Sequence, residues 1–129
     1  MATPSELNDE SPIAQLRRWF ECEPGSIVAA AELSLLRRIL PDLFGYHIVQ
    51  LGCHHIEGLI TSSRVSHQIK VELSHANHTD AQLRCVDDAL PIAAGAIDVL
   101  VLPHVLEFAQ DPRRVLREAE RVLIGEGHI

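Results

Sequence analysis

One apolar stretch that ends in glycine constrains the fold of this chain more than any other feature. Tyr46-His-Ile-Val-Gln-Leu-Gly52 is followed by the turn-forming residues Cys53-His-His-Ile-Glu-Gly58. An apolar run that ends in glycine and a turn is how a buried parallel strand delivers a ligand-binding loop to the edge of an α/β sheet. The stretch therefore predicts such a sheet, with a ligand loop directly after its first strand.

Length and charge limit the classes of function. With 129 residues, 47% of them hydrophobic, the chain has material for one core, and we expect one structural domain. The net charge of -7 and the lack of a Lys/Arg cluster argue against a nucleic-acid partner, because phosphate binding needs grouped cations. No apolar run approaches the length of about 20 residues that a membrane span requires, so we expect no membrane partner.

The cysteine pattern indicates the redox setting. Cys22, Cys53 and Cys85 are an odd number without CxxC spacing, and no basic stretch followed by an apolar run opens the chain. These features predict free thiols in a reducing, cytoplasmic protein.

The first 45 residues predict a tail and two helices. Residues 1–10 are polar, which is typical of a frayed end. Ser11-Pro12 predicts the start of a short helix that Glu23-Pro-Gly25 ends. A second helix is expected from Ile27 until Pro41 stops it. Its apolar stripe consists of Ala29, Leu33, Leu36 and Leu40.

Beyond the glycine loop, strand and helix patterns alternate. A short helix is expected over Ile56–Ser63, and Asp111-Pro112 predicts a later helix that Gly125 or Gly127 ends. His128-Ile129 has the character of the start of another strand. The other predicted strands are His67–Leu73, Gln82–Val86 and Ala96–Leu102. This alternation predicts an α/β fold with a mostly parallel sheet of about four strands flanked by helices.

Several ordered motifs resemble one family of enzymes. The motifs are Asp88-Ala-Leu-Pro91, Ala94-Gly-Ala-Ile-Asp98-Val-Leu-Val, His104-Val-Leu-Glu-Phe108, Asp111-Pro and Leu116-Arg-Glu-Ala-Glu-Arg-Val-Leu-Ile-Gly-Glu-Gly127. Together they resemble the Rossmann-like (class I) S-adenosylmethionine-dependent methyltransferases of the type 11 branch. The resemblance covers Tyr46–Ile129, and residues 40–46 with Trp19-Phe20 resemble the lead-in of a bacterial, specifically proteobacterial, subgroup.

The resemblance implies a division of the chain and a function. Residues 46–129 would be a partial methyltransferase domain, truncated after the fourth strand and the helix behind it, and residues 1–45 its helical lead-in. The implied function is transfer of a methyl group from S-adenosylmethionine to a small-molecule acceptor. The alternative is a non-catalytic interaction module of the same fold that binds the cofactor weakly or not at all.

Glu72 is the expected partner of the cofactor's ribose. A carboxylate at the end of the second strand can accept hydrogen bonds from both ribose hydroxyls. Val71-Glu-Leu-Ser74 resembles the family's V-D-L-S, and Glu72 lies about twenty residues after Gly52, as such an acid should. The alternative is that Glu72 is only the polar member of an alternating strand.

The loop after the first strand departs from the family pattern of an acid followed by G-x-G-x-G. Gln50 stands in place of the acid, Gly52 is the first glycine, and His54 and Ile56 replace the other two. These side chains would crowd the cofactor's path, and Gly58 would supply a displaced turn. A sheet-edge turn without a ligand is the alternative.

On the adenine side, Val86 occupies the position of the family's acid, so Asp87 would serve from one place later. Asp87 as a solvated turn residue is the alternative. The cofactor contacts that the resemblance implies are Gln50, Gly52, Cys53, His54, Gly58, Glu72, Leu73, Asp87, Asp88, Ala89 and Pro103.

His104 is the candidate catalytic residue, since it follows the fourth strand and histidine titrates near neutral pH. A structural role is the alternative. The other histidines and Cys53 fit no zinc spacing, so no metal site is expected. The arginines and glutamates after Asp111 predict a solvated helix face.

The end of the implied truncated sheet predicts a partner. If no strand follows, Ile97–Leu102 has an open apolar edge, and such edges pair with other chains. We therefore expect a homodimer formed through this edge.

Overall fold

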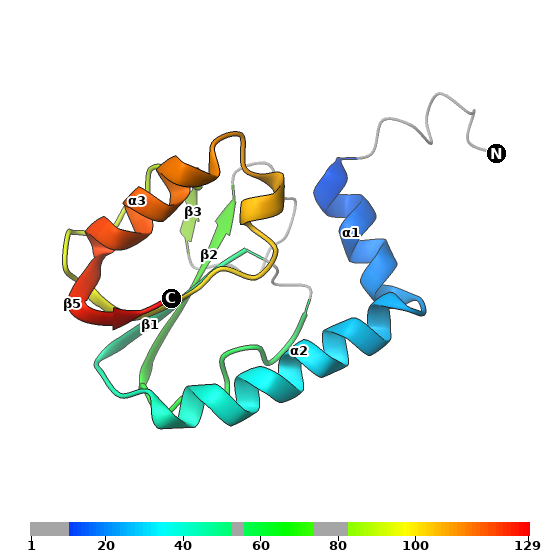
Figure 1. Ribbon diagram of the computed structural model, residues 1–129, viewed down its shortest axis with the longest axis horizontal. Helices are drawn as coiled ribbons and strands as arrows, with labels where there is room; N and C mark the ends of the chain where they lie inside the picture. Colours follow the sequence, from blue (N-terminus) through cyan, green and yellow to red (C-terminus); the bar gives the residue numbers. More distant parts are fainter. Residues whose placement is uncertain (1–10, 53–55, 74–82) are drawn as a thin grey trace.

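The computed structural model describes residues 11–52, 56–73 and 83–129. Its sheet has five strands in the order β3-β2-β1-β4-β5, and every neighbouring pair is parallel (Figure 1). The predicted α/β fold with a parallel sheet is confirmed. The elements are α1 Pro12–Glu21, α2 Gly25–Ile39, η1 Leu40–Asp42, β1 His47–Leu51, β2 His67–Leu73, β3 Leu83–Cys85, β4 Ile97–Val101, η2 Leu106–Phe108, α3 Pro112–Val122 and β5 Leu123–His128.

Local signals in the sequence set the helix boundaries. The hydroxyl oxygen of Ser11 accepts the backbone N–H of Ala14 and caps α1. The carboxylate of Asp111 accepts the N–H groups of Arg113 and Arg114 and caps α3. Pro41 lacks an N–H group, and α2 passes there into the single turn η1.

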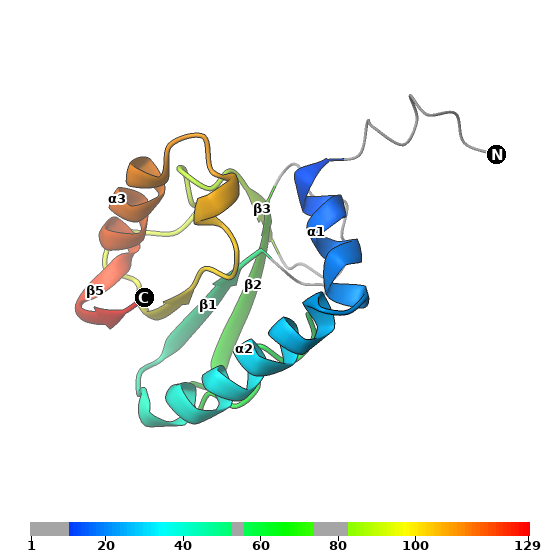
Figure 2. The same ribbon diagram turned by 45° about the vertical axis from the view of Figure 1, so that its right-hand side comes forward.

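The sheet is covered by one long helix on each face (Figure 2). Side chains alternate along a strand, so β1 sends Val49 and Leu51 to one face and Ile48 to the other. The first face packs on α3 through Val115, Ala119 and Val122. The second face packs on the end of α2 and on η1 through Leu33, Leu36 and Leu40. The predicted apolar stripe of α2 is confirmed at these three leucines.

The helix expected over Ile56–Ser63 is wrong. This segment forms consecutive turns, in which Thr61 N–H donates to the carbonyl oxygen of Gly58 and Ser63 N–H to that of Ile60. Both bonds span three residues. A segment this short gains too few hydrogen bonds to offset the cost of starting an α-helix.

The region after α3 also differs from the prediction. The helix ends at Val122, ahead of both glycines, and β5 starts at the next residue. Backbone bonds from Gly95 to Arg121 and from Ala96 to Val122 hold the end of α3 beside the start of β4. The chain therefore leaves the helix directly alongside β4. The open edge expected at Ile97–Leu102 is wrong, because β4 lies between β1 and β5.

Asp98 joins the first residues of β1 to β4 at the amino-terminal edge of the sheet. Its Oδ2 accepts the N–H groups of Tyr46 and His47, each at 2.9 Å. A Cβ atom on Gly45 would lie 2.3 Å from Cγ of Asp98, so only glycine permits this approach. Asp98 therefore has a structural role, at the opposite edge from the loops expected to bind a ligand.

Among the described helices, none has the length and apolar character needed to cross a membrane.

Candidate cofactor site at the carboxyl edge of the sheet

Gly52 and Glu72 lie next to each other where β1 and β2 end. Gly52 is buried with φ +77°, and its N–H donates to the carbonyl oxygen of Val71 at 2.8 Å. This bond attaches the glycine turn to the residue that precedes Glu72. Side chains rarely adopt such a positive φ, so the turn requires glycine.

Glu72 and Leu73 close β2 and are buried, with 2% and 3% of their surface exposed. In register, Gln50 pairs with Lys70, and alternation along β2 places Glu72 on the same face as these two residues. A buried carboxylate at a strand end is uncommon because of its desolvation cost. The structure thus places Glu72 where the ribose acid was predicted.

Gln50, which the sequence resemblance placed in the position of an acid, is 1% exposed. Its Nε2 donates to the carbonyl oxygen of Gly52 at 2.9 Å, so the amide holds the turn from below. Its Oε1 is buried and has no hydrogen-bond partner among the described residues. A buried acceptor without a partner costs about 1–3 kcal/mol, which a ligand's N–H could recover.

The connection after β3 forms the wall of a cavity. Ala89 N–H donates to the carbonyl oxygen of Val86, which closes the turn containing Asp87 and Asp88. The cavity beside this turn has a volume of about 480 Å³. It is lined by Ser11, Pro12, Ile13, Val86, Asp87, Asp88, Phe108, Gln110, Asp111 and Arg114. The start of α1 therefore faces the turn that was predicted to bind adenine.

Two side chains of α3 hold the end of this turn. Oε1 of Glu118 accepts the N–H of Leu90 at 2.9 Å, and Nη2 of Arg121 donates to the carbonyl oxygen of Leu90 at 3.1 Å. Arg121 Nε also donates to Glu118 Oε2 at 2.9 Å. The solvated-face prediction is therefore wrong for Glu118, whose side chain is 14% exposed, whereas Arg117, Glu120 and Arg121 are exposed. The spacing of charged residues along a helix cannot indicate that one of them binds a distant loop, as Glu118 and Arg121 bind Leu90.

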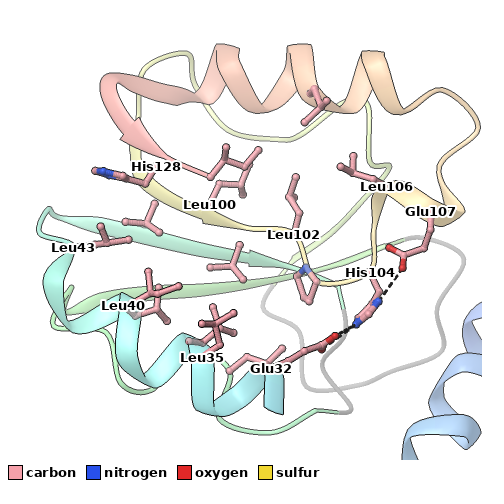
Figure 3. A pocket seen from close by; sticks show the side chains of 18 residues that line it. Glu32, Leu35, Leu40, Leu43, Leu100, Leu102, His104, Leu106, Glu107 and His128 are labelled. Atoms are coloured by element: carbon pink, nitrogen blue, oxygen red, sulfur yellow. Dashed lines mark hydrogen bonds and ion pairs between the residues drawn. The ribbon is translucent and has the colours of Figure 1, made fainter. Parts of the chain in front are cut away.

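His104 lies between two carboxylates after β4 (Figure 3). Nε2 is 2.8 Å from Oε1 of Glu32 on α2, and Nδ1 is 2.9 Å from Oε2 of Glu107 in η2. Burial works to lower the pKa of His104, but the hydrogen bonds to Glu107 and Glu32 and their negative charges outweigh it and raise the pKa. The ring of Phe20 packs against the imidazole, with centroids 5.1 Å apart.

This arrangement bears on the catalytic role predicted for His104. A ring that donates from both nitrogens is an imidazolium and has no free lone pair to accept a proton. Its backbone has φ 53°, a conformation that is uncommon outside glycine. His104 also lies at one end of a largely apolar cavity of about 680 Å³ between α2 and β4. The contacts join α2 to the loop after β4.

The remaining predicted residues are placed as follows. Cys53 and His54 lie outside the described residues. Gly58 lies in the turn after them with φ +76°, and Pro103 lies two residues after the end of β4 and is half-buried. His67 is at the opposite edge of the sheet, with its Nδ1 2.6 Å from Nδ1 of His47. Within the described ranges, no three His, Cys, Asp or Glu side chains group as metal ligands.

Cys85, the last residue of β3, is a free thiol directly before the turn that contains Asp87 and Asp88. Burial, together with the nearby charges of Asp87 and Glu118, raises its pKa to about 11. The thiol therefore stays protonated at neutral pH and is a poor nucleophile.

Comparison with known proteins identifies the family. The sequence profile of the methyltransferase domain family matches residues 45–129. The chain belongs to this family. It is also 32% identical over 109 residues to the uncharacterized protein YafS of Escherichia coli K12, an alignment that covers 84% of this chain and 44% of YafS. The chain thus spans less than half the length of that relative.

Solved structures show the same fold. One is a methyltransferase of Thermotoga maritima, described as S-adenosylmethionine-dependent and a possible histamine N-methyltransferase. The match covers 90% of this chain and 55% of that one, at 22% identity and a TM-score of 0.67. An S-adenosylmethionine-dependent methyltransferase of Mesorhizobium loti matches 73% of this chain with 49% of its own, at 21% identity and TM-score 0.51. The sheet is therefore a Rossmann-like methyltransferase sheet.

Proposed function

We propose that this domain binds S-adenosylmethionine at the carboxyl edge of the sheet and takes part in methyl transfer to a small-molecule acceptor. The observation that carries the proposal is the contact between the Gly52 turn and β2. The Gly52 N–H bonds to Val71, and the next residue is the buried carboxylate of Glu72. A glycine turn beside a strand-end acid is the arrangement that binds a nucleoside in such sheets.

The residues present at this edge fit the parts of the cofactor. The Glu72 carboxylate offers acceptors for the two ribose hydroxyls. Asp87 and Asp88 line the cavity proposed for adenine, whose amino group would donate to a carboxylate. The unpaired Oε1 of Gln50 is an acceptor for the amino group of the methionine part. Each assignment pairs a donor of the ligand with an acceptor of this chain.

The cofactor, when bound, supplies a methyl group on a positively charged sulfur. The contribution of the chain is to hold the two reactants in line, since correct orientation accounts for much of the rate of a displacement between bound reactants. In the described structure both nitrogens of His104 already face carboxylates. We therefore propose that His104 holds α2 to the β4 loop and does not take the acceptor's proton in this state.

Gln50 favours a second candidate function. A neutral amide stands where the family's acid is expected, so the site lacks one negative charge to attract a cationic ligand. The domain would then be an interaction module with weak or no cofactor binding.

The homodimer remains a proposal for either function. On the side of the sheet where β4 was expected to be the outer strand, the outer strand is β5. A cytoplasmic setting is proposed from the cysteine pattern alone.

Calorimetric titration separates the two functions. The wild type, Glu72→Ala and Glu72→Gln are titrated with S-adenosylmethionine and with its demethylated product. Losing hydrogen bonds to a charged group costs about 1.5–3 kcal/mol, so we expect both variants to bind roughly 10- to 100-fold more weakly. Glu120→Ala, an exposed carboxylate on α3, is the matched control and should bind as the wild type does.

A wild type that gives no heat at high micromolar ligand would support the interaction module. Equal affinity in all variants would show that Glu72 does not contact the ribose.

A further inference from the structure

We propose that Glu118 and Arg121 are positioning residues for the adenine part of the cofactor, acting through the backbone of Leu90. The inference rests on the proposed function, because it assumes that the turn of residues 86–89 binds adenine. Neither side chain lines the cavity beside that turn. Both would act by fixing where the turn ends, at Leu90.

The contact between α3 and Leu90 uses both the N–H and the carbonyl group of Leu90. Glu118 accepts the N–H of Leu90, and Arg121 donates to its carbonyl oxygen, so one peptide residue is held at both of its polar groups. Arg121 is itself oriented by Glu118. Hydrogen bonds of this kind, in which one partner is charged, are shorter and stronger than neutral ones. The pair therefore fixes the position of the Leu90 backbone relative to α3.

The position of Leu90 determines that of the turn. Its side chain is 7% exposed and belongs to the core on the α3 face. Ala89, the residue before it, is bonded back to Val86, the residue directly after β3. Asp87 and Asp88 are thus enclosed between two fixed points, β3 and the Leu90 backbone. With these points fixed, the backbone that carries the two aspartates is preorganised for a ligand.

The charge of Glu118 also supports its role in holding Leu90. The hydrogen bond from Arg121 lowers the pKa of Glu118 against the opposing effect of burial, and the N–H of Leu90 lowers it further. The carboxylate is therefore charged throughout the neutral range. Arg114 also approaches Asp88, at 3.8 Å, but both side chains are well exposed and the contact is weak.

The test compares two ligands in one protein. S-adenosylhomocysteine carries the adenine amino group, and S-inosylhomocysteine has a carbonyl oxygen there, which would face the carboxylates. We expect the wild type to prefer the adenine ligand and Glu118→Ala to lose about tenfold of that preference. Glu118→Gln keeps an acceptor for the Leu90 N–H and should keep most of the preference. Arg117→Ala on the exposed face is the control and should match the wild type.

A ratio of two affinities separates positioning from general damage. Partial unfolding lowers the binding of both ligands equally and leaves their ratio unchanged. An unchanged ratio in Glu118→Ala, with both ligands bound, would overturn the inference and leave the proposed function intact. Absence of binding by either ligand to the wild type would overturn both.

Amide hydrogen exchange at Leu90 in the ligand-free protein tests the contact itself. We expect exchange to be faster by about tenfold or more in Glu118→Ala than in Glu118→Gln. Equal exchange in the two variants would overturn the inference without reference to any cofactor.

Discussion

The loops after β3 and β4 are both tied to a helix, but by different chemistry. Glu118 and Arg121 of α3 bind the backbone of Leu90 after β3. Glu32 of α2 and Glu107 bind the side chain of His104 after β4. The two helices lie on opposite faces of the sheet. The carboxyl edge is thus held from both sides.

The two sets of contacts differ in how their charges depend on pH. A carboxylate with a lowered pKa and a guanidinium stay charged from mildly acidic to mildly alkaline pH. An imidazole does not, even with a raised pKa. The loop after β3 should therefore keep its contacts at all physiological pH values, whereas the loop after β4 keeps both of its carboxylate contacts only while His104 is protonated.

The largest expected effect is on the β3 loop. Glu118→Ala leaves the N–H of Leu90 without its acceptor and removes the carboxylate that Arg121 binds. We expect the free energy of unfolding to fall by roughly 2–3 kcal/mol, by the same amount at about pH 6 and about pH 9. Urea denaturation at the two pH values measures this. A loss that appears at only one pH would contradict the comparison.

A smaller, pH-dependent effect is expected at His104. Its folded pKa is raised above the unfolded value, so its stabilisation is complete below the unfolded pKa and disappears as the pH rises through the folded pKa. His104→Gln should therefore be less stable than the wild type by about 1 kcal/mol near pH 6 and by almost nothing near pH 9. All other residues are the same in the two proteins, so the difference isolates the contribution of His104. A difference that grows with pH would have the wrong sign.

The smallest effect is expected at Arg114. Its ion pair with Asp88 spans 3.8 Å between side chains that are 67% and 36% exposed. Arg114→Ala should change the free energy of unfolding by less than about 0.5 kcal/mol. A loss comparable to that of Glu118→Ala would show that the turn is held from Asp88 as well as from Leu90.

Most of the fold could be predicted from local patterns. The strands at His47–Leu51 and Ile97–Val101 are apolar runs, and the caps Ser11 and Asp111 lie directly before helices. Such signals involve neighbours in sequence. The strand β5 could not be predicted from its glycines, because strands rarely contain them. Its formation depends on backbone bonds that place the end of α3 beside β4.

The candidate site could be predicted only in part. Glu72 could be predicted as a candidate ribose ligand because a strand end and a spacing from Gly52 are both visible in the sequence. The contact with Leu90 could not be predicted, because the pattern of α3 gives Glu118 and Arg121 as surface charges. Their partner is a backbone group that lies 28 residues before Glu118 and 31 residues before Arg121. Glu32 was missed for the same reason, because its partner His104 is 72 residues distant. Contacts between distant segments leave no periodic trace.

The most direct test of the account is to map the binding site of S-adenosylhomocysteine on the isotope-labelled protein by NMR. The account predicts saturable shifts of the backbone amides of Gly52 and Leu73, where β1 and β2 end, and of Ala89 in the turn after β3, and none at His67 on the opposite edge. Shifts confined to the His67 edge, or no saturable shift at any ligand concentration, would contradict it.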